Sequence, residues 1–255
     1  MKLNFKLLML PVLAVFLCGA GSFSFTETCM DNNKVAKVKF VSFENEMPDM
    51  AEINAKFTEM ESHPVDVVNW PERNNGYNPK ASFKIMYSEK YLYIRYEVAE
   101  KEIRAAFDDD SIAMPWTDDC MELFIIPESS NGIYYNIEMN CVGCGIVGMG
   151  ATSKDRVRLT VEQRKRIRRF STLGREAFGE RVSKEGDIEW YMIIAVPWDL
   201  LTDKGVECVK GKRVRANVYK CGDKMFSPHY LTWNPIGTPA PRYHTPEFFG
   251  YMDFE

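Results

Sequence analysis

The chain has 255 residues, a formal net charge of −4 and 13% aromatic residues. A chain of this length can bury a full hydrophobic core, in one large domain or two small ones. Acidic and basic residues are nearly balanced, which excludes the strong positive field of a nucleic-acid-binding protein. The basic run at residues 164–169 (RKRIRR) is interpreted as a solvated strand or turn rather than a polyanion site.

The N-terminus carries the pattern of an export signal. Two lysines precede an apolar run at residues 7–17, and small residues follow at 19–22. This predicts a signal peptide at residues 1–22, too short for a membrane-spanning helix of about 20 apolar residues. Cys18 follows Leu17, which is not the small residue that a lipid-anchor site favours. We expect an exported protein without a transmembrane span, in the periplasm, at the cell surface or outside the cell.

The rest of the chain is dominated by short strand patterns. Residues 30–80 are expected to be irregular with a short helix at 50–60, and strands at 82–88 and 90–98 form a hairpin pattern. Further strands are expected at residues 120–126, 133–141, 186–196, 212–220 and 248–254. Many short strands without βαβ alternation predict an all-β fold. We expect an antiparallel β-sandwich of the immunoglobulin or jelly-roll kind, with an irregular N-terminal segment, as one domain at residues 28–255.

Two familiar motifs give little functional information. Residues 143–148 match the glycine-rich dinucleotide-binding pattern, but a turn or strand is expected there instead of the helix that holds the pyrophosphate. Cys141 and Cys144 form a C-x-x-C pair without a second close pair, so a zinc ribbon is not supported. Export permits disulfides, and removal of Cys18 with the signal peptide leaves 7 − 1 = 6 cysteines, whose pairing stays open.

Catalytic patterns are equally sparse. The sequence has 3 histidines and no G-x-S-x-G motif, which gives serine hydrolase chemistry no support. Paired carboxylates are present, and they leave open the alternative of a glycosidase acid and nucleophile. These carboxylates belong to Asp118, Asp119, Glu122 and Glu138. The acidic run at residues 108–111 is interpreted as a solvated turn in preference to a calcium site.

The polar faces of three predicted strands hold the most informative side chains. Glu122 lies on the first of these faces. The other two faces carry Asn136, Glu138 and Asn140, and Arg215 and Asn217. Planar groups that hydrogen-bond at two points can bind the vicinal hydroxyls of a sugar. An aromatic ring can stack on the apolar face of the same sugar, and Trp116 and Trp233 are the candidates for this role.

Several stretches resemble the family 9 carbohydrate-binding modules, specifically a stand-alone secreted branch found in Gram-negative glycan degraders. They are VVNWPE (67–72), PWTDDCMELFI (115–125), YYNIEMNCVG (134–143), ANVYKCGD (216–223), PHYLTWNPI (228–236) and YHTPEFFGYMDF (243–254). They follow the family's order across nearly the whole mature chain. The resemblance implies a β-sandwich and structural calcium, whose ligand residues it does not assign, and no other cofactor.

The resemblance also implies particular site residues. Trp116 and Trp233 match the two tryptophans between which family members clamp a sugar, often at a reducing end. Glu122 matches the family's sugar-binding glutamate, and Asn140 matches an asparagine on the next strand. We therefore expect both tryptophans to stack on the ligand while Glu122 and Asn140 fix its hydroxyls.

The chain departs from the family pattern at one position. Glu138 stands where the best-known members have an arginine two residues before the asparagine. Arg215, from another strand, is considered as a replacement, and Asn217 is a further candidate for contact with the sugar. His229 or Tyr230 would supply the polar group that some members carry shortly before the second tryptophan.

We expect a non-catalytic carbohydrate-binding protein that serves polysaccharide catabolism and holds a mono- or oligosaccharide between aromatic side chains. The chain leaves no room for a catalytic domain, so a glycoside hydrolase partner would be a separate polypeptide. Two alternatives stay open. One is a glycoside hydrolase that uses Glu122 and Glu138, and the other is an envelope module whose polar face docks another protein.

Overall fold

The computed structural model describes residues 33–255, so the predicted signal peptide, Cys18 and Cys29 lie outside the described residues. The strands are β1 Val35–Phe40, β2 His63–Pro64, β3 Lys80–Tyr87, β4 Tyr91–Glu100, β5 Glu102–Ala105, β6 Cys120–Ile126, β7 Tyr134–Asn140, β8 Gly145–Gly150, β9 Val157–Arg158, β10 Arg168–Ser171, β11 Gly179–Val182, β12 Ile188–Pro197, β13 Arg213–Cys221, β14 Tyr230–Thr232 and β15 Gly250–Phe254. The helices are α1 Met50–Lys56, α2 Pro71–Asn74 and α3 Val161–Lys165, with 3-10 turns η1 Phe57–Glu59, η2 Pro115–Thr117, η3 Trp198–Leu200, η4 Gly205–Cys208 and η5 Pro246–Phe248.

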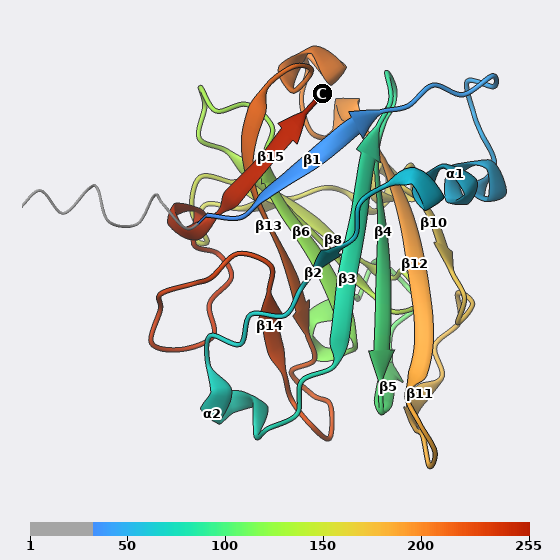
Figure 1. The fold of residues 1–255 in the computed structure, drawn as a ribbon, viewed down its shortest axis with the longest axis vertical. Coiled ribbons are helices and arrows are strands. Elements are labelled where there is room, and N and C mark those ends of the chain that lie inside the picture. The colour runs from blue at the N-terminus through green and yellow to red at the C-terminus, as the bar shows by residue number, and fades with distance from the viewer. Residues whose placement is uncertain (1–32) are drawn as a thin grey trace, which may run out of the picture. The chain divides into compact units, whose positions relative to one another are not determined.

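Thirteen of the strands in residues 33–255 form one continuous curled sheet that folds into two layers, and β5 and β11 form a separate two-stranded sheet. The order of the larger sheet is β10-β12-β4-β3-β1-β15-β13-β6-β7-β8-β9. Figure 1 shows β3, β4 and β12 in front of β13, β6 and β8, so that the two halves face each other as a sandwich. The expected all-β, sandwich-like fold is confirmed.

The expectation of a purely antiparallel sheet with an irregular N-terminal segment needs correction at β1. This strand pairs in parallel with both β15 and β3, and it thereby connects the two layers (Figure 1). Ala36 and Val38 of β1 are fully buried, whereas the lysines between and beside them face outward. The strand is short and its apolar signal rests on these two small side chains, so its sequence gives only a weak alternating pattern.

The core lies between the two layers because each strand turns one set of alternate side chains inward. Phe83 and Ile85 of β3 meet Leu123 of β6 and Val218 of β13 in a single buried cluster. Met121 and Ile125 extend the same face of β6. The opposite faces of β13, β6 and β7 carry a separate buried cluster that includes Tyr219, Phe124 and Tyr134, and they also hold polar side chains such as Glu122.

Most predicted elements match the structure. The strand expected at residues 120–126 is β6 itself, and the expected hairpin is β3 and β4, paired in antiparallel register. The expected helix begins at Met50 behind Asp49, whose carboxylate accepts the backbone N–H groups of Ala51 and Glu52. The glycine-rich motif leads into β8 rather than into a helix, so it lacks the helix N-terminus that holds a dinucleotide.

A buried ionic cluster joins Lys220 of β13 to Glu100 of β4 and to Asp119, the residue before β6. The Lys220 ammonium is fully buried and lies 2.7 Å from Asp119 Oδ1 and 3.1 Å from Glu100 Oε2. Burial acts to lower the pKa of Lys220, but the charges of Asp119 and Glu100 outweigh it and raise this pKa. Lys220 Nζ also lies 2.6 Å from His229 Nε2. Burial first, and then the charge of Lys220, lower the pKa of His229, so the ring is neutral and accepts the lysine's hydrogen bond.

Candidate functional site

One row of side chains crosses four strands on the face that points away from the core. Tyr219 of β13 pairs in register with Glu122 of β6. Glu122 in turn pairs with Glu138 of β7, which pairs with Ile146 of β8. Because their strand neighbours point into the core, these four side chains all project to the outer face.

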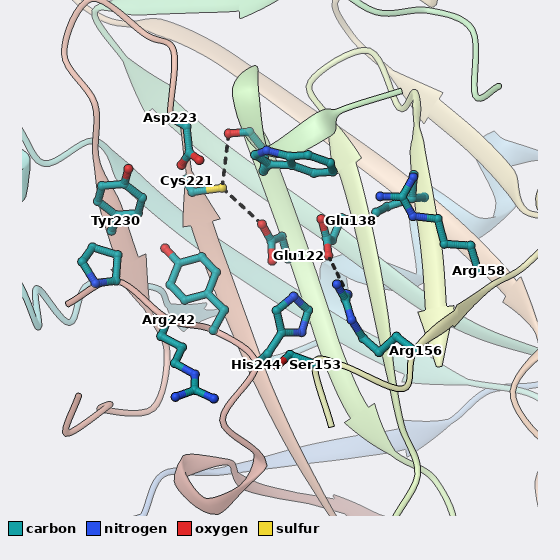
Figure 2. A pocket seen from close by; sticks show the side chains of 14 residues that line it. Glu122, Glu138, Ser153, Arg156, Arg158, Cys221, Asp223, Tyr230, Arg242 and His244 are labelled. Carbon is teal, nitrogen blue, oxygen red and sulfur yellow. Dashed lines mark hydrogen bonds and ion pairs between the residues drawn. The ribbon is translucent and has the colours of Figure 1, made fainter. Parts of the chain in front are cut away.

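A cavity of about 440 Å³ lies over Glu122, Glu138 and Ile146 of this row, a volume typical of small-molecule sites. Figure 2 shows Glu122 and Glu138 near its centre, with Arg156 and Arg158 on one side and Tyr230 on the other. Its walls come from segments far apart in the sequence, at residues 153–158, 221–230 and 241–244. The strands supply the floor and the loops supply the walls.

Trp116 lines this cavity from η2, the turn that Pro115 begins just before β6. Its ring is half-buried and packs against the core on one side. Its carbonyl accepts the backbone N–H of Asp223 at 2.9 Å, which ties the turn to the opposite wall. A ring held in this way, with part of its surface in the cavity, can act as a stacking platform.

The two glutamates of the floor are buried, with exposed fractions of 2% for Glu122 and 4% for Glu138. Cys221 Sγ donates to Glu122 Oε1 at 3.2 Å, and Asn136 Nδ2 donates to Glu138 Oε1 at 2.7 Å. Burial, and next the charge of Glu138, raise the pKa of Glu122 well above its ordinary value. Burial also raises the pKa of Glu138, to about 7. A protonated Glu122 donates as well as accepts hydrogen bonds, which suits the hydroxyls of a ligand.

The raised pKa of Glu138 predicts that the stability of the folded state depends on pH. Between its ordinary value of 4.5 and about 7, the folded state holds a proton that the unfolded state has released. The contribution of Glu138 to the free energy of unfolding is therefore complete below about pH 4.5, and it falls as the pH rises towards about 7. We expect Glu138→Gln to remove this loss, worth up to about 3 kcal/mol.

Urea unfolding at about pH 4.5, 6 and 8 measures this effect as the difference between variant and wild type. The difference should grow in favour of Glu138→Gln with rising pH. Glu185→Gln, at an exposed position outside the cavity, is the control. A Glu138→Gln difference that stays flat with pH would contradict the assigned pKa.

The wall at residues 241–244 is fixed by aromatic contacts. Tyr243 stacks on Tyr219, with ring centroids 4.1 Å apart and planes 5° from parallel. His244 Nδ1 lies 3.0 Å from the hydroxyl of Tyr134. Burial, and then the charges of Arg156 and Arg242, lower the pKa of His244 to about 3, so this ring is neutral at physiological pH.

Three amide or guanidinium side chains predicted for the site do not line the cavity. The Asn140 side chain is fully buried, where it donates to Phe107 O and Asp118 Oδ2. Asn217 is likewise buried, and its amide bonds the backbone of Asn234 on both sides. Arg215 Nη2 donates to the carbonyls of Glu247 and Phe249. These side chains hold loops onto the sheet, so the structure gives them no direct contact with a ligand in the cavity.

Trp233 also lies away from the cavity, and this changes the expected two-tryptophan clamp. Its side chain is 2% exposed and belongs to the core between the layers. The ring meets Phe83 edge-on at 5.6 Å and lies 6.3 Å from the ring of His63. A ring enclosed in this way cannot stack on a ligand that arrives from solvent, so the cavity has one tryptophan, Trp116.

Of the two polar candidates near Trp233, Tyr230 lines the cavity and His229 belongs to the buried ionic cluster. Sequence reasoning missed the arginines of the walls, Arg156, Arg158 and Arg242. They lie in loops or in a short edge strand, where the alternation of residues does not predict the direction in which a side chain points. His244 was within a stretch of family resemblance, but nothing in its pattern indicated a place in the site.

Among residues 33–255, two groups place three metal-ligating atoms within 4.8 Å of one another. They are Cys120, Glu122 and Cys221, and Glu100, Asp119 and His229. In the first group two of the three ligand atoms are thiol sulfurs, whereas calcium takes oxygen ligands. In the second, Lys220 already supplies the positive charge. The expected calcium therefore stays a prediction without assigned ligands.

The three aspartates at residues 108–110 each accept hydrogen bonds from the protein. Asp108 accepts from Ala177 N, Asp109 from Ser111 N, and Asp110 from Gly145 N. Asp110 also pairs with Arg169 at 2.8 Å. Asp108 and Asp109 are exposed, as expected of a solvated turn, whereas Asp110 is largely enclosed by its contacts with Gly145 and Arg169.

No helix in the described part of the chain is both long enough and apolar enough to span a membrane.

Comparison with known proteins identifies the family. The model of carbohydrate-binding family 9 matches residues 49–254, and the chain belongs to this family. It is a family of non-catalytic binding modules. A search of curated protein sequences finds no match.

Solved structures agree with this assignment. A protein from Bacteroides uniformis ATCC 8492, described as a candidate carbohydrate-binding protein, is 34% identical, with a TM-score of 0.79 over 88% of this chain and 100% of that one. A family 9 module from Caldicellulosiruptor kristjanssonii in complex with glucose is 12% identical, with a TM-score of 0.54 over 87% of this chain and 96% of that one. The same organism's module with cellotriose is 12% identical, with a TM-score of 0.55 over 87% and 94%. At this identity the Caldicellulosiruptor structures bear on the fold alone.

Proposed function

We propose that this protein is an exported, non-catalytic carbohydrate-binding protein that holds a mono- or oligosaccharide in the cavity over β6 and β7. The observation that carries the proposal is the position of Trp116, half-buried beside the two buried carboxyl groups of the floor. The apolar C–H face of a sugar ring stacks on such a ring, and its hydroxyls reach the polar groups around it.

Residues of the floor and of the walls have different roles in binding the sugar. Trp116 is the stacking platform, and Glu122 and Glu138 hydrogen-bond the hydroxyls of the ring. Tyr230 and His244 bring one hydroxyl and one neutral imidazole to the same cavity. These groups contact the sugar in place of Trp233 and Asn140, which the sequence predicted as binding residues.

The known relatives and the N-terminus support the wider role. The Caldicellulosiruptor modules of this fold are complexes with glucose and cellotriose, which makes saccharides the natural ligand class to test. The signal pattern at residues 1–22 supports export, and binding of sugars outside the cytoplasm serves polysaccharide catabolism. A separate glycoside hydrolase would then supply catalysis.

A glycoside hydrolase remains the second candidate, because Glu122 and Glu138 are direct cross-strand neighbours in one cavity. The pKa of about 7 for Glu138 would suit a general acid. Two observations favour binding instead. The family consists of non-catalytic modules, and burial keeps the pKa of Glu122 well above the range in which it would serve as an ionised nucleophile at neutral pH.

Replacing Trp116 with alanine tests the proposal. We expect Trp116→Ala to weaken saccharide binding about tenfold or more, because it removes the stacking surface. The domain should stay folded, since the ring is only half-buried. Calorimetric titration of wild type and variant against a panel of neutral and acidic oligosaccharides, with and without calcium, measures the affinity.

Phe170→Ala is the matched control, since Phe170 is a partly exposed aromatic residue on β10 outside the cavity. This variant should bind as wild type does. Unchanged binding by Trp116→Ala, or no response of wild type to any sugar, would contradict the proposed function.

A further inference from the structure

Three guanidinium groups line the cavity without a close hydrogen-bond partner among the described residues. They belong to Arg156, Arg158 and Arg242. Within residues 33–255, the polar contact recorded for them is an ion pair from Arg156 Nη1 to Glu138 Oε1, at the long distance of 3.9 Å. Arg158 lies with its guanidinium carbon 5.9 Å from the ring centre of Trp116.

Arg156 is the most informative of the three. Its side chain is 24% exposed, and its Nε atom is buried without a hydrogen-bond partner. In the described part of the chain, the Nε of Arg169 lacks a partner as well, but its Nη atoms pair with the carboxylate of Asp110. Arg164 Nη1 likewise donates to the carbonyls of Asp110 and Gly145, both at 2.7 Å, whereas no described residue gives the Nη atoms of Arg156 a contact of this kind. The partly exposed guanidinium of Arg156, whose nearest carboxylate contact is 3.9 Å long, therefore keeps a hydrogen-bonding capacity that a ligand can complete.

The charges around the cavity favour an anion. Guanidinium groups stay charged at all physiological pH values. The carboxyl groups that face them are pushed towards the neutral form, because burial raises the pKa of Glu122, Glu138 and Asp223. Figure 2 shows Arg156 directed at Glu138, with Arg158 at the same side of the cavity. The cavity is therefore richer in positive than in negative charge although the whole chain is acidic.

Resting on the proposed function, we propose that the ligand of this cavity is an acidic saccharide, whose carboxylate or sulfate group pairs with Arg156 while its ring lies against Trp116. The planar fork of a guanidinium matches two oxygens of such a group, and charge-assisted hydrogen bonds of this kind are the strong ones. Arg158 and Arg242 add positive charge at the rim, which accelerates and selects the approach of an anion. The ligand group takes the place of the long, 3.9 Å contact between Arg156 and Glu138.

Calorimetric titration of the full chain with matched pairs of sugars tests this inference. The pairs are glucuronate with glucose, galacturonate with galactose, and galactose 6-sulfate with galactose. We expect wild type to bind the acidic member of at least one pair about tenfold more tightly at low salt. The uronate and sulfate pairs distinguish the two sources of negative charge, and a preference in either supports the proposal.

Arg156→Gln should lose this preference and keep the weaker binding of the neutral sugar. Arg213→Gln, which removes the same charge from a surface pair with Asp253 outside the cavity, should keep the preference. If Arg156→Gln does not fold, the salt dependence of wild-type binding tests the proposal instead. The preference of wild type for the acidic sugar should shrink between about 50 and 500 mM salt, because screening increases.

The outcomes separate this inference from the function on which it rests. Neutral sugars that bind as tightly as acidic ones would overturn the acidic ligand and leave the carbohydrate-binding function in place. No binding of either class would overturn both. A preference that survives in Arg156→Gln, or that ignores salt, would overturn the assignment to Arg156.

Discussion

Trp233→Ala is expected to lower the free energy of unfolding by about 3–5 kcal/mol, the range for removing a large aromatic side chain from a packed core. The ring is 2% exposed and lies edge-on to Phe83. The backbone N–H of Trp233 donates to Val218 O at 2.8 Å, which fixes the residue against β13. Alanine would leave a cavity between the two layers that neighbouring side chains fill only in part.

Chemical denaturation of Trp233→Ala, beside Trp116→Ala and wild type, measures this difference. Trp116→Ala should cost less stability, because its ring is half-buried, but more affinity for sugar. The two tryptophans would then have separate roles, one in the core and one in the site. A stable Trp233→Ala variant that has lost sugar binding would restore the two-tryptophan clamp predicted from the family resemblance.

Lys220→Met is the second substitution expected to have a large effect, also about 3–5 kcal/mol. Methionine keeps the length and apolar stem of the side chain but removes the ammonium between Asp119 and Glu100. Asp119 and Glu100 would then share a fully buried site without a cation, and His229 would lose its hydrogen-bond donor. A buried carboxylate left without its partner is far more costly than the loss of a surface ion pair.

Lys210→Met is the matched control, because Lys210 pairs with Glu89 at 3.2 Å on the surface and its side chain is 46% exposed. It should change the free energy of unfolding by about 1 kcal/mol or less. Equal effects of the two substitutions would show that the buried cluster does not stabilise the fold in the way argued.

The strands that carry the site could be predicted from the sequence because their alternation is strong. Met121, Leu123 and Ile125 alternate with Glu122, and this pattern placed Glu122 on the outer face of β6, where the structure has it. Trp116, just before this strand, also lines the cavity. Alternation of this kind depends only on the period of the strand, so it needs no knowledge of what covers either face.

The rest of the site depends on which segments cover each face of the sheet and on where the loops run. The alternation of apolar and polar residues gives no information on either. Asn140 lies on the same face of β7 as Glu138, but the carbonyl of Phe107 and the carboxylate of Asp118 meet its amide and enclose it. Trp233 packs among apolar side chains of the core. The sequence around it does not distinguish a ring that stacks on a sugar from a ring that packs in the core. Arg156 comes from the connection between β8 and β9, whose course over the sheet is set by tertiary contacts.

A crystal structure of the protein with the saccharide that binds most tightly in the panel would test the central claim most directly. We predict a sugar ring stacked on Trp116, with hydroxyl groups hydrogen-bonded to Glu122 or Glu138 in the cavity of Figure 2. The same sugar ordered on another face, with this cavity filled only by water, would contradict the account.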